Sequence, residues 1–501
     1  MSESPATAAF SSLYDSVATQ ADLRPDAPAL SCGDATLNYR ELIAAVDRTA
    51  RAQRDQGLGR GAFVGWLGQN SVEMLLSLLA CAKLGAVWVP LNWRLAPAEL
   101  AEIGRHAGLN GLLGTPEMAE LTSAVRALLG DLPPPSLQAE DAAEGAAENA
   151  ARDAADDLLL VYTSGTTGRP KGAIHTHRGM LANIDAAVAV QRLTAADRVL
   201  SALPLFHVGG LCIQTLPALA VGAAVRLLPR FEAGAWLAAV REWRPTVSLL
   251  VPAAMRALLE HPDWPTSPLD SLRFVNSGSM VVPLALIEAF HQRRLTVTQV
   301  YGSTESGPVS IALSPDEALA LPGRVGRPAL GVRVQLVDEA GQDVSPGAIG
   351  EIWLKAPNLL RAYHREPDHP DWRDGWLHTG DLGIQDGQGV YSVVGRLKDM
   401  LISGGENIYP AEIENLVEGF PGVAECAVVG LLDPRWGEVP VLAVVVTAGS
   451  TLDLDALRQH LTQHLARYKQ PRDIVLRTAL PKTALGKVQK SALAAELSVQ
   501  A

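Results

Sequence analysis

The sequence contains few cysteines and no cysteine pair. Its 501 residues include only four, Cys32, Cys81, Cys212 and Cys426. They form neither a CxxC pair nor a cluster with histidine, and structural zinc sites and disulfide frameworks need such spacings. The sequence therefore argues against both kinds of site. Scattered single cysteines are typical of a reducing compartment, so we expect a cytoplasmic protein.

An excess of basic residues is also missing. The formal net charge is −12 at pH 7 and the isoelectric point is about 5.4. Proteins that bind nucleic acid broadly carry a basic face, so this composition excludes a general nucleic-acid binder. It leaves room for a local basic site that binds a small anion.

Export and membrane patterns are absent as well. The N-terminal stretch MSESPATAAFSSLYD lacks the basic region followed by an apolar stretch that marks a secretory signal peptide. Residues 203–225 contain no Asp, Glu, Lys or Arg, but they include two prolines and a glycine pair. We therefore expect a buried core segment there and no membrane span.

The sequence does contain a regular alternation of strand and helix patterns. Residues 36–110 predict a helix at 42–56, a strand at 62–67, a helix at 71–84 and a strand at 86–90. This alternation is typical of an α/β fold with a largely parallel sheet. Predicted strands resume at 158–162, 199–202, 224–228, 247–251, 272–276 and 296–300, and a β-rich stretch covers 332–394.

Length and composition divide the chain. A chain of 501 residues is too long for one core, so we expect at least two domains. Residues 131–157, rich in Pro, Ala and acidic residues, indicate a solvated connector. After residue 395 the pattern restarts as a compact α+β unit. We predict an N-terminal domain at 1–395, a hinge at 396–400 and a C-terminal domain at 401–501.

A dense run of small and hydroxyl residues follows the predicted strand 158–162. It is Thr163-Ser164-Gly165-Thr166-Thr167-Gly168-Arg169-Pro170-Lys171-Gly172. Glycines and hydroxyls let backbone N–H groups approach a polyphosphate closely, and the lysine adds a positive charge. The run is not a Walker A loop, in which Ser or Thr follows the lysine. It predicts a phosphate-binding loop of a different type rather than an ordinary turn.

Four further motifs follow in order. They are Tyr301-Gly302-Ser303-Thr304-Glu305; Trp376-Leu377-His378-Thr379-Gly380-Asp381; Gly395-Arg396-Leu397-Lys398-Asp399 with Ser403-Gly404-Gly405-Glu406-Asn407-Ile408-Tyr409-Pro410; and Pro481-Lys482-Thr483 with Gly486-Lys487. Together with the phosphate loop, they resemble the motifs of the adenylate-forming superfamily, in its acyl-CoA synthetase and aryl-CoA ligase branch. The resemblance covers nearly the whole chain, and five motifs in order are far more specific than one.

The resemblance implies both a fold and a reaction. The implied fold class is α/β, with a large N-terminal domain of stacked sheets, a β-rich subdomain and a small mobile C-terminal α+β lid. The implied enzyme is an acid–thiol ligase that uses ATP, Mg²⁺ and coenzyme A. It converts a carboxylic acid, through its acyl-AMP, to acyl-CoA, AMP and diphosphate.

The resemblance also assigns roles at the nucleotide site. Glu305 is the implied Mg²⁺ ligand, Thr304 donates to the α-phosphate, and Asp381 accepts from the ribose hydroxyls; each role suits the side chain. Tyr301 is implied to stack on adenine. The other implied nucleotide contacts are Thr163, Ser164, Gly165, Thr166, Thr167, Gly168, Ser277, Gly278, Ser279, Gly302 and Arg396.

Three lysines receive roles by resemblance. An isolated lysine such as Lys487, in a predicted exposed loop, is normally a solvated charge. In this family the equivalent lysine enters the active site and binds the carboxylate and the transferring phosphate, a task that suits a compact charge on a flexible arm. Lys171 is the second implied catalytic cation. Lys398 falls at the implied hinge, where backbone freedom matters more than the side chain.

The acceptor site is implied by a glycine-rich segment. Ser403-Gly404-Gly405 leaves room for the narrow pantetheine arm of coenzyme A, because glycine permits close approach. By resemblance, the CoA nucleotide lies near Trp436, Arg94, Tyr468 and Lys469.

By resemblance, the acyl pocket is lined by His207, Val208, Gly209, Leu250, Ser277, Gly278, Val300, Gly302, Gly307, Pro308 and Val309. None of these is charged, so a second carboxylate or an ammonium on the substrate would be buried unpaired. We therefore expect an apolar aromatic acid or a medium or long alkyl acid. The glycines at 209, 302 and 307 are expected to leave space for an aryl group. His207 is either a core histidine bonded to backbone or a residue that gates the site.

Two other functions remain open from the sequence. One is an enzyme that adenylates an amino acid or another carboxylate for a carrier protein, although residues 205–210 lack the acid that usually pairs with a substrate ammonium. The other is a non-catalytic nucleotide-binding protein on the same fold, against which Glu305 and Lys487 argue. The oligomeric state, with a homodimer as one option, and the identity of the acid are also open.

Overall fold

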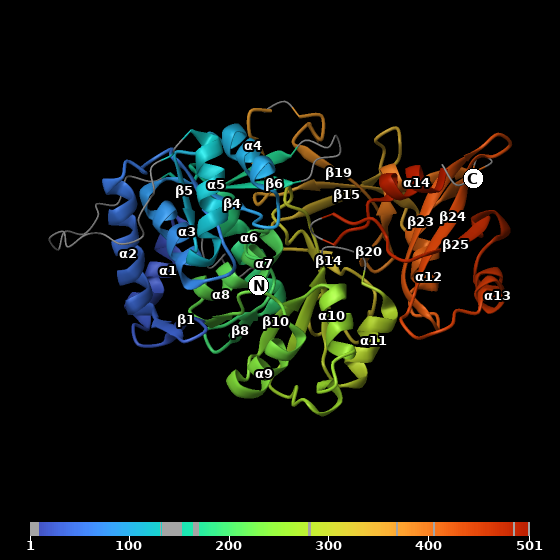
Figure 1. Cartoon of the computed structure of the whole chain (residues 1–501), viewed down its shortest axis with the longest axis horizontal. Coiled ribbons are helices and arrows are strands. Elements are labelled where there is room, and N and C mark those ends of the chain that lie inside the picture. Colours follow the sequence, from blue (N-terminus) through green and yellow to red (C-terminus); the bar gives the residue numbers. More distant parts are fainter. Residues whose placement is uncertain are drawn as a thin grey trace.

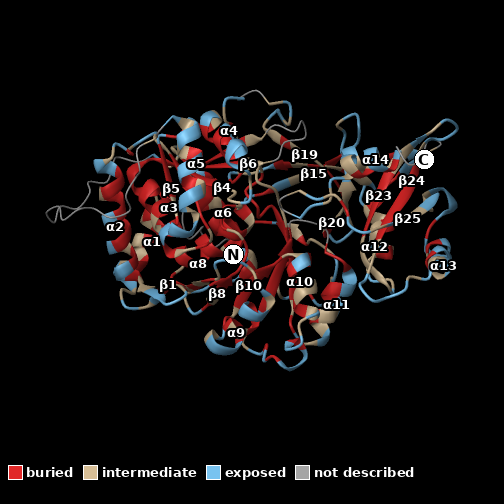
Figure 2. Ribbon diagram, in the orientation of Figure 1, coloured by how far each residue is buried: buried red, intermediate tan, exposed pale blue. Residues whose placement is uncertain are grey.

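The computed structural model describes residues 10–130, 132, 153–163, 170–278, 282–366, 369–403, 406–483 and 486–498. Within them, four β-sheets and their helices build an α/β protein, which confirms the predicted fold class (Figure 1). The strands are largely buried, and the outward faces of the helices are exposed (Figure 2).

The largest sheet has nine strands in the order β14-β13-β12-β11-β10-β8-β9-β1-β2. Their bounds are β1 Pro28–Cys32, β2 Ala35–Asn38, β8 Arg198–Ser201, β9 Ala224–Leu227, β10 Val247–Leu250, β11 Phe274–Gly278, β12 Val297–Tyr301, β13 Ile311–Ala312 and β14 Arg327–Pro328. Neighbouring strands from β1 to β12 in this order are parallel. One face packs on α9 (Ala233–Trp243), α10 (Pro252–Leu259), η3 (Trp264–Thr266) and α11 (Leu284–Gln292).

The second sheet has six strands in the order β17-β7-β6-β4-β3-β5. Their bounds are β3 Phe63–Leu67, β4 Val87–Leu91, β5 Gly111–Gly114, β6 Asp157–Thr163, β7 Lys171–Thr176 and β17 Ala362–Tyr363. Helices α4 (Pro97–Ala107) and α5 (Ala119–Leu129) cover one face. Between the two sheets, one apolar cluster includes residues of α1 (Leu13–Leu23), α2 (Tyr39–Asp55), α3 (Val72–Leu84) and α6 (His177–Gln191).

The predicted alternation is confirmed where its periodicity was strongest. The helices expected at 42–56 and 71–84 are α2 and α3, and the strands expected at 62–67 and 86–90 are β3 and β4. Asn38 caps α2, since its side chain accepts from the Glu41 backbone N–H while Glu41 accepts in return from the Asn38 backbone N–H. Most of the predicted connector at 131–157 lies outside the described residues.

Residues 203–225 form a buried segment, as predicted. It contains α7 (Val208–Gly210), a π-helical turn η2 (Leu211–Thr215) and α8 (Leu216–Ala220). π-turns are rare inside helices and are frequent at functional sites. Among the described residues, no helix has both the length and the apolar character needed to cross a membrane.

A five-stranded antiparallel sheet follows, as the β-rich stretch predicts. It comprises β15 (Arg333–Val337), β16 (Ile349–Lys355), β18 (Trp372–Arg373), β19 (Trp376–Gln385) and β20 (Tyr391–Arg396). The chain leaves this sheet through η4 (Leu397–Asp399), which contains Lys398.

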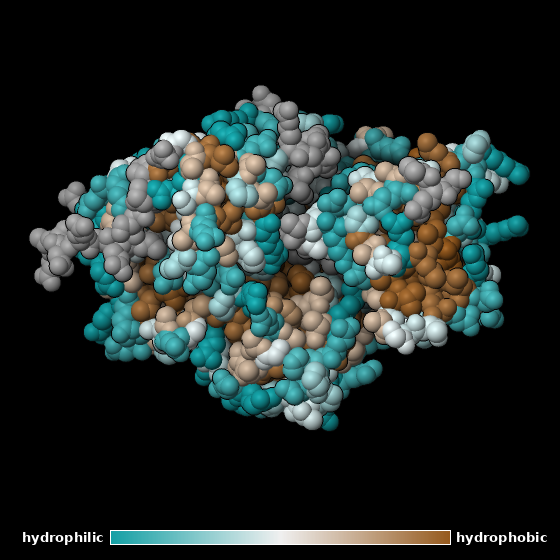
Figure 3. All heavy atoms as spheres, viewed as in Figure 1, coloured by the Kyte–Doolittle hydropathy of each residue, from teal (hydrophilic) through white to brown (hydrophobic). Residues whose placement is uncertain are grey.

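The last sheet belongs to the C-terminal unit, which lies at one end of the molecule (Figure 1). Its strands are β21 (Leu401–Ser403), β22 (Glu406–Ile408), β23 (Val423–Asp433), β24 (Gly437–Val446) and β25 (Asp473–Arg477), and its helices are α12 (Pro410–Val417), α13 (Leu454–His464), η5 (Arg467–Lys469) and α14 (Lys490–Ser498). The unit has its own apolar clusters on both faces of the sheet. The molecular surface is recessed where this unit meets the rest of the chain (Figure 3).

Candidate functional site

The centre of the site is the carboxylate of Asp381 on β19. Tyr301, at the end of β12, donates its hydroxyl to Asp381 Oδ2 at 2.9 Å, and Arg396 Nε lies 2.8 Å from Asp381 Oδ1. Burial raises the pKa of Asp381, although Arg396 and Tyr301 oppose the shift. Both carboxylate oxygens keep free lone pairs and face a tyrosine and an arginine, so the group can also accept from two vicinal hydroxyls. The structure therefore brings together three of the predicted nucleotide residues.

Two glycines shape the strand ends beside Tyr301. A Cβ atom on Gly278, at the end of β11, would clash with the Val300 carbonyl, and one on Gly302 would clash with the backbone of Pro308. Gly307 has a φ of +59° and its missing Cβ makes way for the Asn358 carbonyl. The prediction that Gly302 and Gly307 leave open space for the substrate is therefore wrong: backbone atoms fill that space.

The phosphate side of the site is described only at its base. Thr163 and Lys171 stand opposite each other at the end of the β6–β7 hairpin. The tip of the loop, with Ser164, Gly165, Thr166, Thr167 and Gly168, lies outside the described residues, as do Ser279, Gly404 and Gly405. Lys171 Nζ lies 2.6 Å from His369 Nε2 and 5.5 Å from the centre of the Tyr363 ring.

Glu305 lies on the same side. Its Oε1 accepts from the Tyr363 hydroxyl at 3.2 Å, and its backbone carbonyl accepts from the Leu360 N–H at 2.7 Å. No cluster of three or more His, Cys, Asp or Glu among the described residues can hold a metal. A single carboxylate nevertheless fits Mg²⁺, because this ion is usually bound by one or two carboxylates, waters and substrate phosphates. Thr304 is half-buried next to Glu305.

Lys487 reaches this edge from the C-terminal unit. Its loop is closed by the Thr483 N–H, which donates to the Lys487 carbonyl at 2.8 Å. The side chain keeps contact with solvent, but the protein that surrounds the cleft lowers its pKa, as does Arg396, while Asp381 and Glu305 raise it. The charges that shift its pKa belong to the nucleotide site. Asp381 and Glu305 thus act on the charge of Lys487, and the catalytic role that the resemblance implies for this lysine stays a prediction.

His207 marks the start of the candidate acyl site. Its ring lies 4.4 Å from the Phe206 ring, and its Nε2 is buried without a hydrogen-bond partner among the described residues. Burial, with a smaller contribution from the cations Arg94 and Lys487, lowers the pKa of His207 to about 3. The imidazole is therefore neutral at physiological pH. Its proximity to Lys487 favours a place in the site over a purely structural histidine.

Val300 and Leu250 were both predicted to line the pocket, but they face opposite sides of the sheet. Val300 is buried in one cluster with Leu203, Ile213, Leu249 and Val309. Leu250, one residue after Leu249, lies instead in the cluster formed with α9, α10 and α11 on the opposite face. Successive strand residues point to opposite faces, so a shift of one position moved the prediction to the wrong side of the sheet.

Ser277 and Val208, also predicted in the pocket, do not lie on the face of Val300. Ser277 stands opposite Leu250 on the neighbouring parallel strand, and its buried hydroxyl has no partner among the described residues. Val208 packs in the cluster between the two large sheets rather than beside Val300. Pro308 and half-buried Gly209 lie in the segments that follow Gly302 and His207.

The predicted CoA residues are spread over two regions. Arg94 lies 5.7 Å from the Phe206 ring, next to His207. Trp436 and Tyr468 are about half exposed on the C-terminal unit, where Ser403 pairs with Gly437. Lys469 is held by Glu412 at 2.8 Å.

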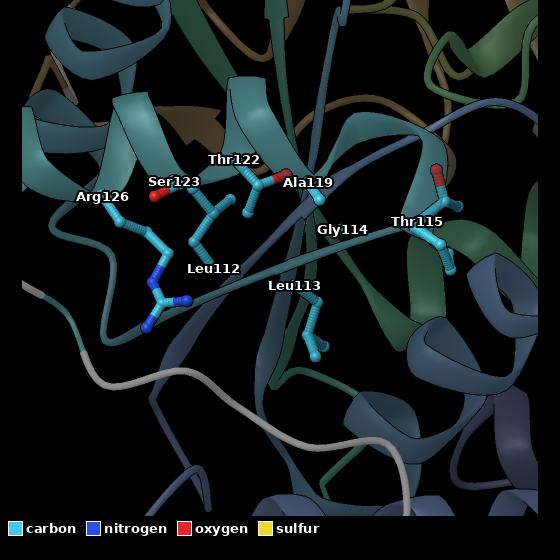
Figure 4. Close-up of a pocket in the computed structure, with 9 residues that line it drawn as sticks. Leu112, Leu113, Gly114, Thr115, Ala119, Thr122, Ser123 and Arg126 are labelled. Carbon is cyan, nitrogen blue, oxygen red and sulfur yellow. The ribbon is translucent and has the colours of Figure 1, made fainter.

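A separate cavity opens at the carboxyl end of β5, beside η1 (Pro116–Met118) and α5 (Figure 4). Its lining includes Thr115, Thr122, Ser123 and Arg126. None of the predicted site residues lines it, so we assign it no part in the reaction.

The sequence did not indicate three residues that contact the site residues, nor an arginine that pairs with the C-terminal unit. His369 and Tyr363 accompany Lys171 and Glu305, as described above. Buried His175 on β7 is hydrogen-bonded to the backbone of Thr304, and burial lowers its pKa to about 4. Arg256 on α10 forms a 3.1 Å ion pair with Glu418, just after α12. None of these residues stands in a recognisable motif, so only the fold could reveal them.

Comparison with known proteins agrees with this geometry. The AMP-binding enzyme family matches residues 17–364, and the AMP-binding enzyme C-terminal domain matches residues 412–487. The chain is 42% identical over 484 residues to an indoleacetate–CoA ligase of Aromatoleum aromaticum, with 94% of this chain and 95% of that protein covered. It is 40% identical over 473 residues to a feruloyl-CoA synthase of Amycolatopsis, covering 94% and 96%.

Solved structures of related enzymes are also similar to this chain over their full length. The crystal structure of an anthranilate CoA ligase in complex with anthranoyl-AMP superimposes with a TM-score of 0.91 at 28% identity and covers 98% of both chains. Sequence motifs, the Asp381–Tyr301–Arg396 cluster and these full-length matches all lead to one assignment. The chain belongs to the family of AMP-binding enzymes.

Proposed function

We infer that the protein is an ATP-dependent carboxylic acid:CoA ligase, which forms an acyl-AMP and transfers the acyl group to coenzyme A. The observation that carries this inference is the Asp381–Tyr301–Arg396 cluster, together with the effect of Asp381 and Glu305 on the charge of Lys487 in the C-terminal unit. A non-catalytic nucleotide-binding protein has no need for a lysine delivered to the nucleotide site by a second unit. We place the reaction in the cytoplasm, since the cysteines of the described residues are free thiols.

In the first step a carboxylate oxygen attacks the α-phosphorus of ATP, and the bond to the β-phosphate oxygen breaks to release diphosphate. Two anions meet in this step, so positioning and positive charge supply most of the rate. Lys487 neutralises charge at the reacting oxygens and Lys171 at the leaving phosphates. Glu305 would hold Mg²⁺, which supplies further positive charge when bound. Asp381 and Arg396 fix the ribose.

In the second step the CoA thiol loses its proton and attacks the acyl carbon, and AMP leaves. The thiol needs the space that Lys487 occupies, so we propose that residues 401–501 rotate about the hinge 396–400. Lys398 lies in η4, directly after the Asp381–Arg396 strand pair, where a turn can move without disturbing the nucleotide cluster. Ser403, Gly404 and Gly405 then line the pantetheine channel, and Arg94 and Trp436 lie near the CoA nucleotide.

The ion pair between Arg256 and Glu418 gives a test of this rotation. Exchanging its charges one at a time, as Arg256→Glu or Glu418→Arg, should slow adenylation about fivefold, because a half-buried pair that joins the two units in the present orientation is replaced by repulsion. The thioester step should not slow. Single-turnover rates of each half-reaction measure this, and the double variant Arg256→Glu/Glu418→Arg should recover the adenylation rate. Failure of the double variant to recover would mean that the pair does not orient the units.

We propose an aromatic acid as the substrate. The wall around Val300 is apolar, each buried methylene contributes about 0.8 kcal/mol, and a flat ring gains buried area without many rotatable bonds. The related ligases named above act on indoleacetate and ferulate. By analogy, an arylacetic or arylpropenoic acid should fit this chain.

A panel of four acids tests the choice. The expected order of kcat/KM is cinnamate above benzoate and octanoate, with malonate lowest by about a hundredfold, because a second carboxylate would be buried without a dedicated partner. AMP release in the presence of CoA is the measurement. A preference for malonate would contradict the proposal and would assign Arg94, the cation next to Phe206, to the acyl pocket.

A further inference from the structure

The phosphate-loop lysine has a histidine partner from a distant part of the chain. Lys171, the first residue of β7, and His369 stand 198 positions apart, yet Lys171 Nζ lies 2.6 Å from His369 Nε2. Pairing of β17 with β7 brings the two segments together, because Tyr363 pairs with Ala173 and the His364 N–H donates to the Gly172 carbonyl at 2.7 Å. The side chain of His369 is only 9% exposed.

The contact with the Lys171 ammonium group determines which nitrogen of the His369 imidazole carries the proton. An ammonium group can only donate, so Nε2 of His369 must accept and carries no proton. The ring proton is therefore on Nδ1. Two groups of Asp371 lie at Nδ1: the backbone N–H is directed at it from 3.2 Å, as toward an acceptor, and the carboxylate Oδ2 lies at 3.3 Å. Because the ammonium group donates at Nε2, a neutral ring carries its proton on Nδ1, where the carboxylate is the acceptor and the N–H contact is no hydrogen bond. The ring of Tyr363, 4.4 Å away, fixes the plane of the imidazole.

His369, the partner of Lys171, is thus neutral, although the carboxylate of Glu305 belongs to the same cluster. Tyr363 contacts both Lys171 and Glu305, since its ring lies under the Lys171 ammonium group and its hydroxyl donates to Glu305. Among the described residues, no ion pair joins Lys171 to Glu305 or to any other carboxylate. A carboxylate partner would compete with a triphosphate for the lysine, whereas a neutral acceptor directs the ammonium and is easily displaced.

We propose that His369 is a positioning residue that holds Lys171 as a releasable tether until the phosphates of ATP take its place. Asp371 keeps the imidazole in the accepting tautomer. The proposal rests on the proposed function, in which Lys171 binds the leaving phosphates.

The test compares three substitutions at one position. His369→Gln keeps a neutral acceptor, His369→Ala removes it, and His369→Glu replaces it with a carboxylate. Direct titration calorimetry with ATP, and with inorganic pyrophosphate, should give dissociation constants within about twofold of the wild type for glutamine, about fivefold weaker for alanine, and at least about tenfold weaker again for glutamate. Steady-state KM for ATP should follow the same order.

The thioester half-reaction from preformed acyl-AMP should be unchanged in all three variants, because the diphosphate has already left. Asp371→Asn provides a second variant, and it should weaken ATP binding less than His369→Ala does. Equal dissociation constants for alanine, glutamine and glutamate would overturn the tether. So would a loss in His369→Gln as large as that in His369→Ala, which would indicate a packing role. If the wild type forms no acyl-AMP from any acid, the proposed function fails, but the binding titrations still decide the tether.

Discussion

Lys487→Ala should abolish adenylate formation while leaving thioester formation from preformed acyl-AMP largely intact. The lysine belongs to the C-terminal unit, and Asp381 and Glu305 both act on its charge. In the proposed first step it neutralises charge at the reacting oxygens. Removing one preorganised charge from such a site costs about a hundredfold to a thousandfold in rate. Acid-dependent release of pyrophosphate measures the first step, and release of AMP from added acyl-AMP and CoA measures the second.

Lys482→Ala is the matched control for this experiment. Lys482 lies in the same loop, but its Nζ is paired with Glu425 at 2.6 Å on the surface of the C-terminal unit. It should therefore change neither half-reaction by more than about twofold, since exposed ion pairs contribute little. An equal loss of both half-reactions in Lys487→Ala would contradict the idea that the C-terminal unit uses different faces in the two steps.

Lys398→Pro should have the opposite effect. Proline fixes φ and removes the backbone N–H, so the turn η4 loses the freedom that a hinge needs. Adenylation should remain within about threefold of the wild type, since Lys487 is already in place, and thioester formation should fall by about tenfold or more. Single-turnover rates of the two half-reactions measure both. Lys398→Ala, which keeps the backbone free, should retain both steps, and an unchanged turnover in Lys398→Pro would place the hinge elsewhere.

Much of the fold could be predicted from local patterns in the sequence. The helices α2 and α3 and the strands β3 and β4 begin and end within three residues of their predicted positions, because periodicity and capping are properties of a short segment. The same holds for Tyr301, Asp381 and Arg396. Each stands in a recognisable motif. Pairing of β19 with β20 brings Asp381 next to Arg396, and Tyr301 reaches Asp381 from the end of β12 in the nine-stranded sheet.

The wrong or missing predictions concern residues whose surroundings are determined by contacts with segments far away in the sequence. Leu250 was predicted in the pocket, but the side that each residue of β10 faces depends on strand register and not on composition. Gly302 and Gly307 were predicted to leave space, yet the backbones of Pro308 and Asn358 occupy it. The contact of His369 with Lys171 spans 198 positions and depends on the pairing of two short strands. No pattern within either segment contains that information.

In the proposed function, the chain activates a carboxylate as its adenylate before CoA enters. The most direct measurement is pyrophosphate release from ATP and cinnamate without CoA, followed by addition of CoA to the same sample. We expect a burst of about one pyrophosphate per active site without CoA, and then continuous turnover to AMP and cinnamoyl-CoA when CoA is added. Release of ADP and phosphate, or pyrophosphate release that requires CoA from the start with every acid tested, would contradict it.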